Sequence, residues 1–217
     1  MHVTRESRLK KVQEINLKRM DIALRKHSIA RETAETKIEL DFLIDGEGKG
    51  KINTGVGFLD HMLVLFTGHG LFDLNVSCDG DIEVDQHHTT EDIGIALGQA
   101  FNMAIGDKKG ITRYATVSIP MDEALATVHL DISGRPHLVY RVEGLKDKVG
   151  NFDTELVQEF FQGFVNHAGV TLHINLEYGT NTHHMIEAIF KAFARALDAA
   201  SSLNPRVKGI PSTKGLL

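Results

Sequence analysis

Two stretches of the chain carry a pair of adjacent histidines followed, three residues later, by a glutamate. They read Asp85-Gln86-His87-His88-Thr89-Thr90-Glu91 and Asn181-Thr182-His183-His184-Met185-Ile186-Glu187, and an apolar pattern of helical spacing follows each. Residues four apart share a helix face, so the first histidine and the glutamate of each stretch can reach one point. The second histidine points roughly a quarter turn away, because a helix turns once per ~3.6 residues, and it is better placed to serve a different point.

This pattern favours a pair of metal sites, because imidazole and carboxylate groups are good ligands for Mn, Fe, Zn, Co and Ni. If the two helices face each other, each metal takes the first His and the Glu from one helix and the second His from the other. The predicted first set is His183, Glu187, His88 and His61, and the predicted second set is His87, Glu91, His184 and Glu159. A single His pair at a helix start more often faces solvent or caps the backbone, but two copies in register favour the metal. Neither copy is the zincin pattern, so a metalloprotease is a poor interpretation.

A second group of residues has the chemistry of a phosphate site. It consists of Arg113, Arg135, Lys191, Ser212, Thr213 and Lys214. The alternative is that the two arginines are ordinary solvated surface charges, and spacing alone does not decide between them. His69 lies on an expected loop and is a candidate substrate contact. Asp122-Glu123, after Pro120, is either an acid pair or a solvated entry to a strand, and we favour the strand entry.

The elements that must position these residues occur twice along the chain. Strands are expected over 36–44, 71–78, 82–84, 114–119, 124–132, 137–142 and 170–176, and helices over 58–66, 85–105, 152–165 and 181–201. His87, His88 and Glu91 recur 96 residues later as His183, His184 and Glu187. The repetition predicts an α+β fold of two duplicated halves, each a mostly antiparallel four-stranded sheet with two helices on one face. The predicted divisions are an extension over 1–30, a first repeat over 31–110, a second repeat over 111–203, and a tail over 204–217.

Composition limits the function classes. The net charge is −5 over 217 residues, which does not indicate nucleic-acid binding. No apolar run reaches the ~18 residues of a membrane span, and the single Cys78 fits a reducing compartment. Residues 1–30 hold eight Lys and Arg against three Asp and Glu, and their apolar residues fall at helical spacings. We expect a helical or frayed extension there rather than an organellar targeting segment, because such segments are poor in acids, and we therefore expect a cytoplasmic protein.

Five motifs, in order along the chain, closely resemble the imidazoleglycerol-phosphate dehydratase family of histidine biosynthesis. They are Arg31-Glu32-Thr33-Ala34-Glu35-Thr36, Asn53-Thr54-Gly55-Val56-Gly57-Phe58-Leu59-Asp60-His61-Met62, Asp85-Gln86-His87-His88-Thr89-Thr90-Glu91-Asp92, Ser133-Gly134-Arg135-Pro136 and His183-His184-Met185-Ile186-Glu187-Ala188. The resemblance covers residues 31–217. It implies a fold like domain 2 of ribosomal protein S5, two Mn²⁺ ions per active site, and a cage of 24 subunits with active sites where subunits meet. The chain departs from the family in two places: many members have His at Glu159, and Ser is common at Thr213.

The resemblance also implies a reaction, the dehydration of imidazole glycerol phosphate to imidazole acetol phosphate. The metals would bind the substrate as an imidazolate and help to expel its C3 hydroxyl, while a carboxylate or histidine takes the C2 proton. The predicted catalytic residues are Glu35, His61, His88 and Glu187, and Glu35 is the acid/base candidate. The predicted substrate contacts are Glu35, His61, His69, His87, His88, Glu91, Arg113, Arg135, His183, Lys191, Ser212, Thr213 and Lys214.

Two other function classes fit the same ligands. One is a structural assembly protein whose paired metal sites join subunits, and it would show no affinity for the phosphate substrate. The other is a di-metal hydrolase, which would release inorganic phosphate. Neither a membrane nor a nucleic acid is an expected partner.

Overall fold

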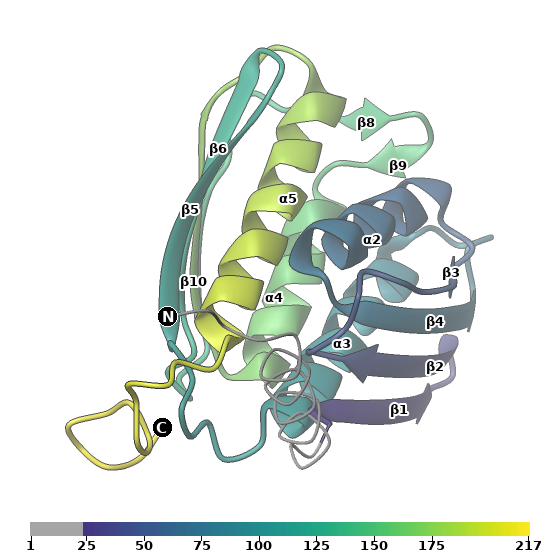
Figure 1. Ribbon diagram of the computed structural model, residues 1–217. Coiled ribbons are helices and arrows are strands. Elements are labelled where there is room, and N and C mark those ends of the chain that lie inside the picture. Colours follow the sequence, from purple (N-terminus) through teal and green to yellow (C-terminus); the bar gives the residue numbers. More distant parts are fainter. Residues whose placement is uncertain (1–23) are drawn as a thin grey trace, which may run out of the picture.

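The computed structural model describes residues 24–217, which form three layers. A four-stranded sheet lies on each side, and the helices fill the space between the two sheets (Figure 1). The part of residues 1–30 that precedes Leu24, including most of the predicted extension, lies outside the described residues.

The two sheets have the same strand order. The first sheet is ordered β1-β2-β4-β3 and the second β5-β6-β10-β7. In each, the last strand is parallel to its neighbour and the other pairs are antiparallel. The strands are β1 Lys26–Glu32, β2 Thr36–Leu43, β3 Ile52–Asn53, β4 Asp73–Gly80, β5 Tyr114–Met121, β6 Ala124–Asp131, β7 His137–Arg141 and β10 Thr171–Tyr178. This confirms the predicted α+β fold of two duplicated halves.

Each half contributes two helices to the middle layer. They are α2 Gly57–Gly70, α3 His87–Ile105, α4 Leu156–Ala168 and α5 Thr182–Ser201. Helix α2 packs against α5 and α3 against α4, so each helix meets one from the other half. Aromatic rings fill the junction: Phe193 of α5 lies 5.5 Å from Phe66 of α2 and 5.0 Å from Phe164 of α4, measured between ring centroids. The shared core fixes the His-bearing turns of α3 and α5 relative to α2 and α4.

Helices α3 and α4 approach each other more closely than side chains would allow. A Cβ at Gly94 would lie 2.3 Å from the carbonyl oxygen of Phe160, and one at Gly98 would lie 2.5 Å from that of Phe164. Real Cβ atoms do not come this near, so glycine is required at both positions of α3.

Three predictions about the elements were wrong. Residues 26–30 belong to strand β1, which pairs with β2 from Lys26 to Glu32, so the first repeat begins before residue 31. The expected extension reaches residue 30 because the apolar residues before Lys26 fall at helical spacings, and that pattern does not show where strand β1 begins. Residues 82–84 form a turn rather than a strand, with the amide of Val84 donating to Asp81. The helix predicted over 152–165 begins at Leu156, because Phe152–Asp153 (β9) pairs with Lys148–Val149 (β8).

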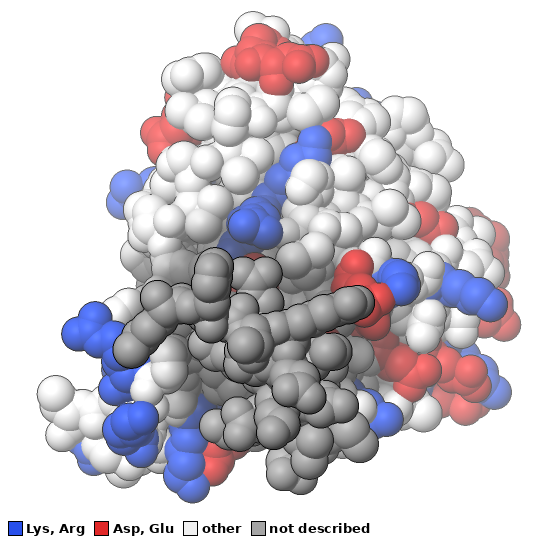
Figure 2. All heavy atoms as spheres, viewed as in Figure 1, with Lys and Arg blue, Asp and Glu red and all other residues white. Residues whose placement is uncertain are grey.

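The tail over 204–217 has no helix or strand, as expected from its prolines and glycines. Lys and Arg side chains gather around it, at lower left in Figure 2. Among the described residues, no helix is long and apolar enough to cross a membrane.

Candidate metal and substrate site

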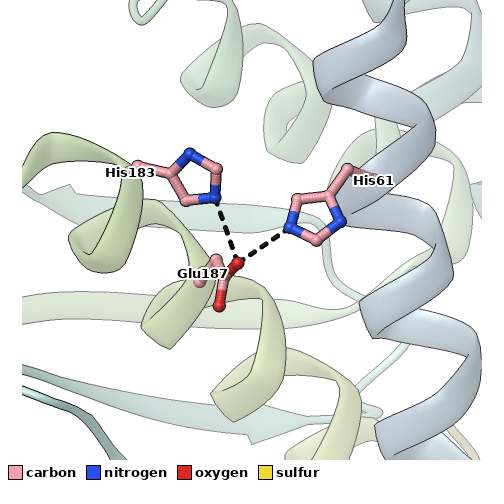
Figure 3. A group of neighbouring side chains, drawn as sticks. All are labelled: His61, His183 and Glu187. Carbon is pink, nitrogen blue, oxygen red and sulfur yellow. Dashed lines mark hydrogen bonds and ion pairs between the residues drawn. The ribbon is translucent and has the colours of Figure 1, made fainter.

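The second His-His-Glu stretch forms the first turn of α5, and its side chains converge on a residue of α2. Asn181 caps this helix by accepting hydrogen bonds from the amides of His183 and His184. Nε2 of His183 lies 3.1 Å from Oε1 of Glu187, and Nε2 of His61 lies 2.8 Å from the same oxygen (Figure 3). Ligand atoms of His61, His183 and Glu187 all lie within 4.8 Å of one another. Two imidazoles and a carboxylate at this spacing suit a divalent transition metal.

Glu187 is buried and is held in its charged form. Burial by itself would raise its pKa, but the ion pair with Lys191 and the hydrogen bonds from His61 and His183 outweigh burial and bring the pKa to about 2. Nζ of Lys191 lies 2.6 Å from Oε2, one turn further along α5. The carboxylate is therefore already deprotonated, as a metal ligand must be.

The corresponding residues of the first repeat are more widely spread. Nε2 of His87 lies 3.8 Å from Glu91, one turn further along α3. Glu159 is half-buried in the first turn of α4, the helix that packs on α3, and so corresponds to His61 on α2. Within residues 24–217, only the group of His61, His183 and Glu187 has three ligands close enough for one ion.

The second histidine of each pair contacts a carboxylate of its own repeat. Nδ1 of His88 lies 3.0 Å from Asp81, and its Nε2 lies 3.6 Å from Glu35. Nδ1 of His184 lies 2.8 Å from Glu123. The hydrogen bond with Asp81 raises the pKa of His88, and that with Glu123 raises the pKa of His184. The predicted exchange of second histidines between α3 and α5 is thus not made within one described chain.

Sequence reasoning missed Asp81 and took Glu123 for a solvated strand entry. Glu123 instead accepts hydrogen bonds from the amides of Thr180 and Asn181, as well as from His184. The His184 contact and these amides lower its pKa to about 2. The signal that could have found it is its place directly before β6, which matches the place of Glu35 directly before β2.

Residues 54–197 match the family model described as imidazoleglycerol-phosphate dehydratase. The chain is 61% identical over 194 residues to proteins of that name from Oceanobacillus iheyensis and Bacillus licheniformis, covering 89% of this chain and all of each relative. The chain belongs to the imidazoleglycerol-phosphate dehydratase family.

Solved structures from the family agree with the fold. The crystal structure of the Staphylococcus aureus dehydratase has a TM-score of 0.74 and 50% identity, covering 82% of this chain and 98% of that one. The Pyrococcus furiosus structure has a TM-score of 0.76 and 36% identity, covering 87% of this chain and all of the other. The predicted resemblance is therefore confirmed, and the family's named members are hydro-lyases.

In this member of the imidazoleglycerol-phosphate dehydratase family, the predicted phosphate ligands fall into two separate groups. Arg113 is clamped by Asp131, with Nε 2.8 Å from Oδ1, and donates to the carbonyl of Pro211 in the tail at 2.8 Å. The tail lies beside the loop that carries Arg135, since the terminal carboxyl carbon of Leu217 lies 2.8 Å from the place of a Cβ on Gly134. This group therefore contains the two arginines and the segment Ser212-Thr213-Lys214.

Lys191 is the member of the set that lies apart. The backbone of Arg113 contacts that of Ala200, nine residues and so about 14 Å of helix from Lys191. The ammonium of Lys191 contacts Glu187 and the sulfur of Met121. His69, at the end of α2, lies on the same side as Lys191, because Arg195, one turn further along α5, donates to the carbonyl of His69. Burial and the charge of Lys191 lower the pKa of the His69 imidazole. One chain therefore does not bring the whole predicted substrate site together.

Proposed function

We propose that this protein is a dehydratase that converts imidazole glycerol phosphate to imidazole acetol phosphate and water in histidine biosynthesis. The observation that carries the proposal is the convergence of His61, His183 and Glu187 in a chain of this family. A structural metal-binding role would not require the arginines and hydroxyls that we assign to phosphate.

The ligand set fits divalent metals, and we propose two Mn²⁺ ions per active site. The carboxylates and imidazoles of the two His-His-Glu stretches, with His61 and Glu159, would hold them. Manganese accepts such mixed nitrogen and oxygen ligands, and Glu187 is already charged. Bound ions would supply Lewis acidity that lowers the pKa of the substrate's imidazole N–H and fixes the ring as an imidazolate.

The protein's own groups would then position the substrate and move its proton. Arg113, Arg135 and the tail hydroxyls would hold the phosphate at one end, and Lys191 would neutralise it from another side. Glu35 would remove the C2 proton as the C3–O bond breaks. That proton would pass to the departing hydroxyl, which leaves as water, and the enol would move its O–H proton to C3 to give the ketone. Glu35 suits this task because its side chain is 51% exposed and lies 3.6 Å from His88.

We further propose that complete active sites form between copies of the chain. Two observations support this. His88 and His184 each contact a carboxylate of their own repeat, away from the ligand cluster, and Lys191 is separated from the other phosphate ligands. A cage of 24 subunits is the expected assembly, and native mass measured with and without Mn²⁺ tests it.

The decisive experiment is a dehydration assay on metal-stripped protein. We expect no product after chelation and full recovery when Mn²⁺ is returned. Full turnover by protein shown by elemental analysis to be metal-free would refute the metal-dependent proposal. Release of inorganic phosphate instead of a ketone would support the hydrolase alternative.

A further inference from the structure

We propose that Arg31, Thr36 and Asp92 are positioning residues that hold Glu35 in place for proton transfer, an inference that rests on the role of Glu35 proposed above. We call these three residues the Asp92 clamp. Asp92 is on α3, directly after the candidate ligand Glu91, and its side chain is 9% exposed. Arg31 and Thr36 flank the β1–β2 turn that carries Glu35.

The clamp ties the turn to the helix through two hydrogen bonds and an ion-pair contact. Nη1 of Arg31 donates to Oδ2 of Asp92 at 3.0 Å, and Nη2 of Arg31 lies 2.9 Å from Oδ1. The hydroxyl of Thr36, which is buried, donates to Oδ2 of the same carboxylate. A bidentate ion pair fixes orientation as well as distance, so the turn cannot rotate relative to α3.

The turn is also fixed from within. Oγ1 of Thr33 accepts hydrogen bonds from the amides of Glu35 and Thr36, at 3.1 and 3.0 Å. The carbonyl of Glu35 accepts one from the amide of Asp81, the residue that holds His88. The backbone of Glu35 is thus held on both sides, while its carboxylate stays exposed and ready for a substrate.

The second repeat shows that the fold does not require this polar network. Ala124 begins β6 as Thr36 begins β2, and Ala188 follows Glu187 as Asp92 follows Glu91. The third position is Ile119, which pairs with Ala126 as Arg31 pairs with Ile38. Buried ion pairs seldom stabilise more than apolar residues of similar size. A polar clamp in only one repeat therefore points to a positional role, in the repeat whose glutamate is free to react.

The test separates positioning from folding and from metal binding. Thr36→Val removes one hydroxyl and keeps the side-chain shape. We expect kcat to fall about 10- to 100-fold, as for a small misplacement of a catalytic group, with KM within twofold and Mn²⁺ affinity unchanged. Thr36→Ser, which keeps the hydroxyl, should restore the rate. Thr127→Val is the matched control, since that buried residue forms a hydrogen bond to Ser118 of the neighbouring strand β5, and it should keep the wild-type kcat.

A double variant connects the effect to Glu35. In a Glu35→Gln background, Thr36→Val should have no further effect on kcat, because the group it positions is gone. Multiplicative losses, an unchanged kcat in Thr36→Val, or a rise in KM alone would each overturn the clamp. If Glu35→Gln itself turned over at the wild-type rate, the proposed role of Glu35 would fail first, and that outcome is visible without any clamp variant.

A triple variant keeps the proposal testable if Thr36→Val fails to fold. The combined change Arg31→Ile, Thr36→Ala and Asp92→Ala copies the residues of the second repeat. We expect it to fold and to bind Mn²⁺, with kcat reduced at least as much as in Thr36→Val. A folded triple variant with wild-type kcat would also overturn the inference.

Discussion

The two repeats share one plan but use their equivalent glutamates differently. The carboxylate of Glu35 is half-exposed and its ion-pair contact is with His88 at 3.6 Å, on a turn that half-buried Arg31 and buried Thr36 fix to Asp92 of α3. Glu123 is bound to the amides that open α5 and to His184. The two repeats therefore have carboxylates at matching places. That of Glu123 accepts hydrogen bonds from backbone amides and from His184, whereas that of Glu35 does not cap a helix. The comparison teaches that an acid/base residue needs a rigid turn and an uncommitted carboxylate together.

The largest expected effect is the loss of catalysis on changing the free glutamate alone. Glu35→Gln should lower kcat by about 10²- to 10⁴-fold, the usual contribution of a positioned acid or base, while substrate still binds. Glu123→Gln, the equivalent change in the other repeat, should lower kcat by less than about tenfold. Steady-state dehydration kinetics of the two variants measure the difference. Equal losses would show that the repeats share the acid/base task.

The fold was predictable because the repeats carry their own periodic signals. The apolar spacing after each His pair predicted α3 and α5, and their recurrence predicted two similar halves. Strand β1 was not predictable in the same way. Its residues alternate between exposed and half-buried, but their polar and apolar types alternate only weakly. The strand is stabilised by pairing with β2, and the sequence of one segment does not reveal its pairing partner.

The candidate site was predictable in its residue types but not in its partners. Helix spacing alone put His183 and Glu187 together, and His61 was predicted as a further ligand of the same metal, which the structure places beside them. The partners of His88 and His184 come from turns distant in sequence, Asp81 after β4 and Glu123 before β6. Where a turn delivers a carboxylate depends on the packing of the whole half, so no local pattern could show it.

The helix interfaces of the two halves give a second, smaller contrast, in stability. Gly98 of α3 lies against the backbone of α4, whereas the equivalent position in α5 is the fully buried Ala194. Gly98→Ala should cost about 1–3 kcal/mol of unfolding free energy through overpacking. Ala194→Gly should cost about 1 kcal/mol through helix propensity. Denaturant unfolding of both variants measures this, and a stabilised Gly98→Ala protein would contradict the close approach.

The hydrogen bonds of Glu123 also predict that the stability of the metal-free protein depends on pH. Its folded pKa of about 2 lies below the ordinary 4.5, so its contribution to stability is present above pH 4.5 and lost as pH falls toward 2. The folded pKa of His184 is raised above 6.5, so its contribution is full below pH 6.5 and lost as pH rises through the folded value. Glu123→Gln should therefore lower Tm more at pH 6 than at pH 8.5. The matched Glu35→Gln protein should show a smaller pH difference, because Asp81 is the main partner of His88.

The smallest expected effect concerns the residues that end α2 and α4. Leu71 and Gly169 follow these equivalent helices, and both have left-handed backbones, with φ of 56° and 66°. A left-handed backbone costs a residue with a side chain roughly 1 kcal/mol, and glycine nothing comparable. Gly169→Ala should therefore lower the unfolding free energy by about 1 kcal/mol. The nearest contacts of the added Cβ would be ordinary ones of 3.7 Å or more, so the cost would be conformational rather than steric.

Leu71→Gly should raise the unfolding free energy by about 0.5 kcal/mol, since relief of the backbone slightly exceeds the added freedom of the unfolded chain. Denaturant titration of both variants would measure these opposite signs. If Leu71→Gly were destabilising, the half-exposed Leu71 side chain would have to be making contacts of its own, and the two helix ends would differ in packing as well as in residue type.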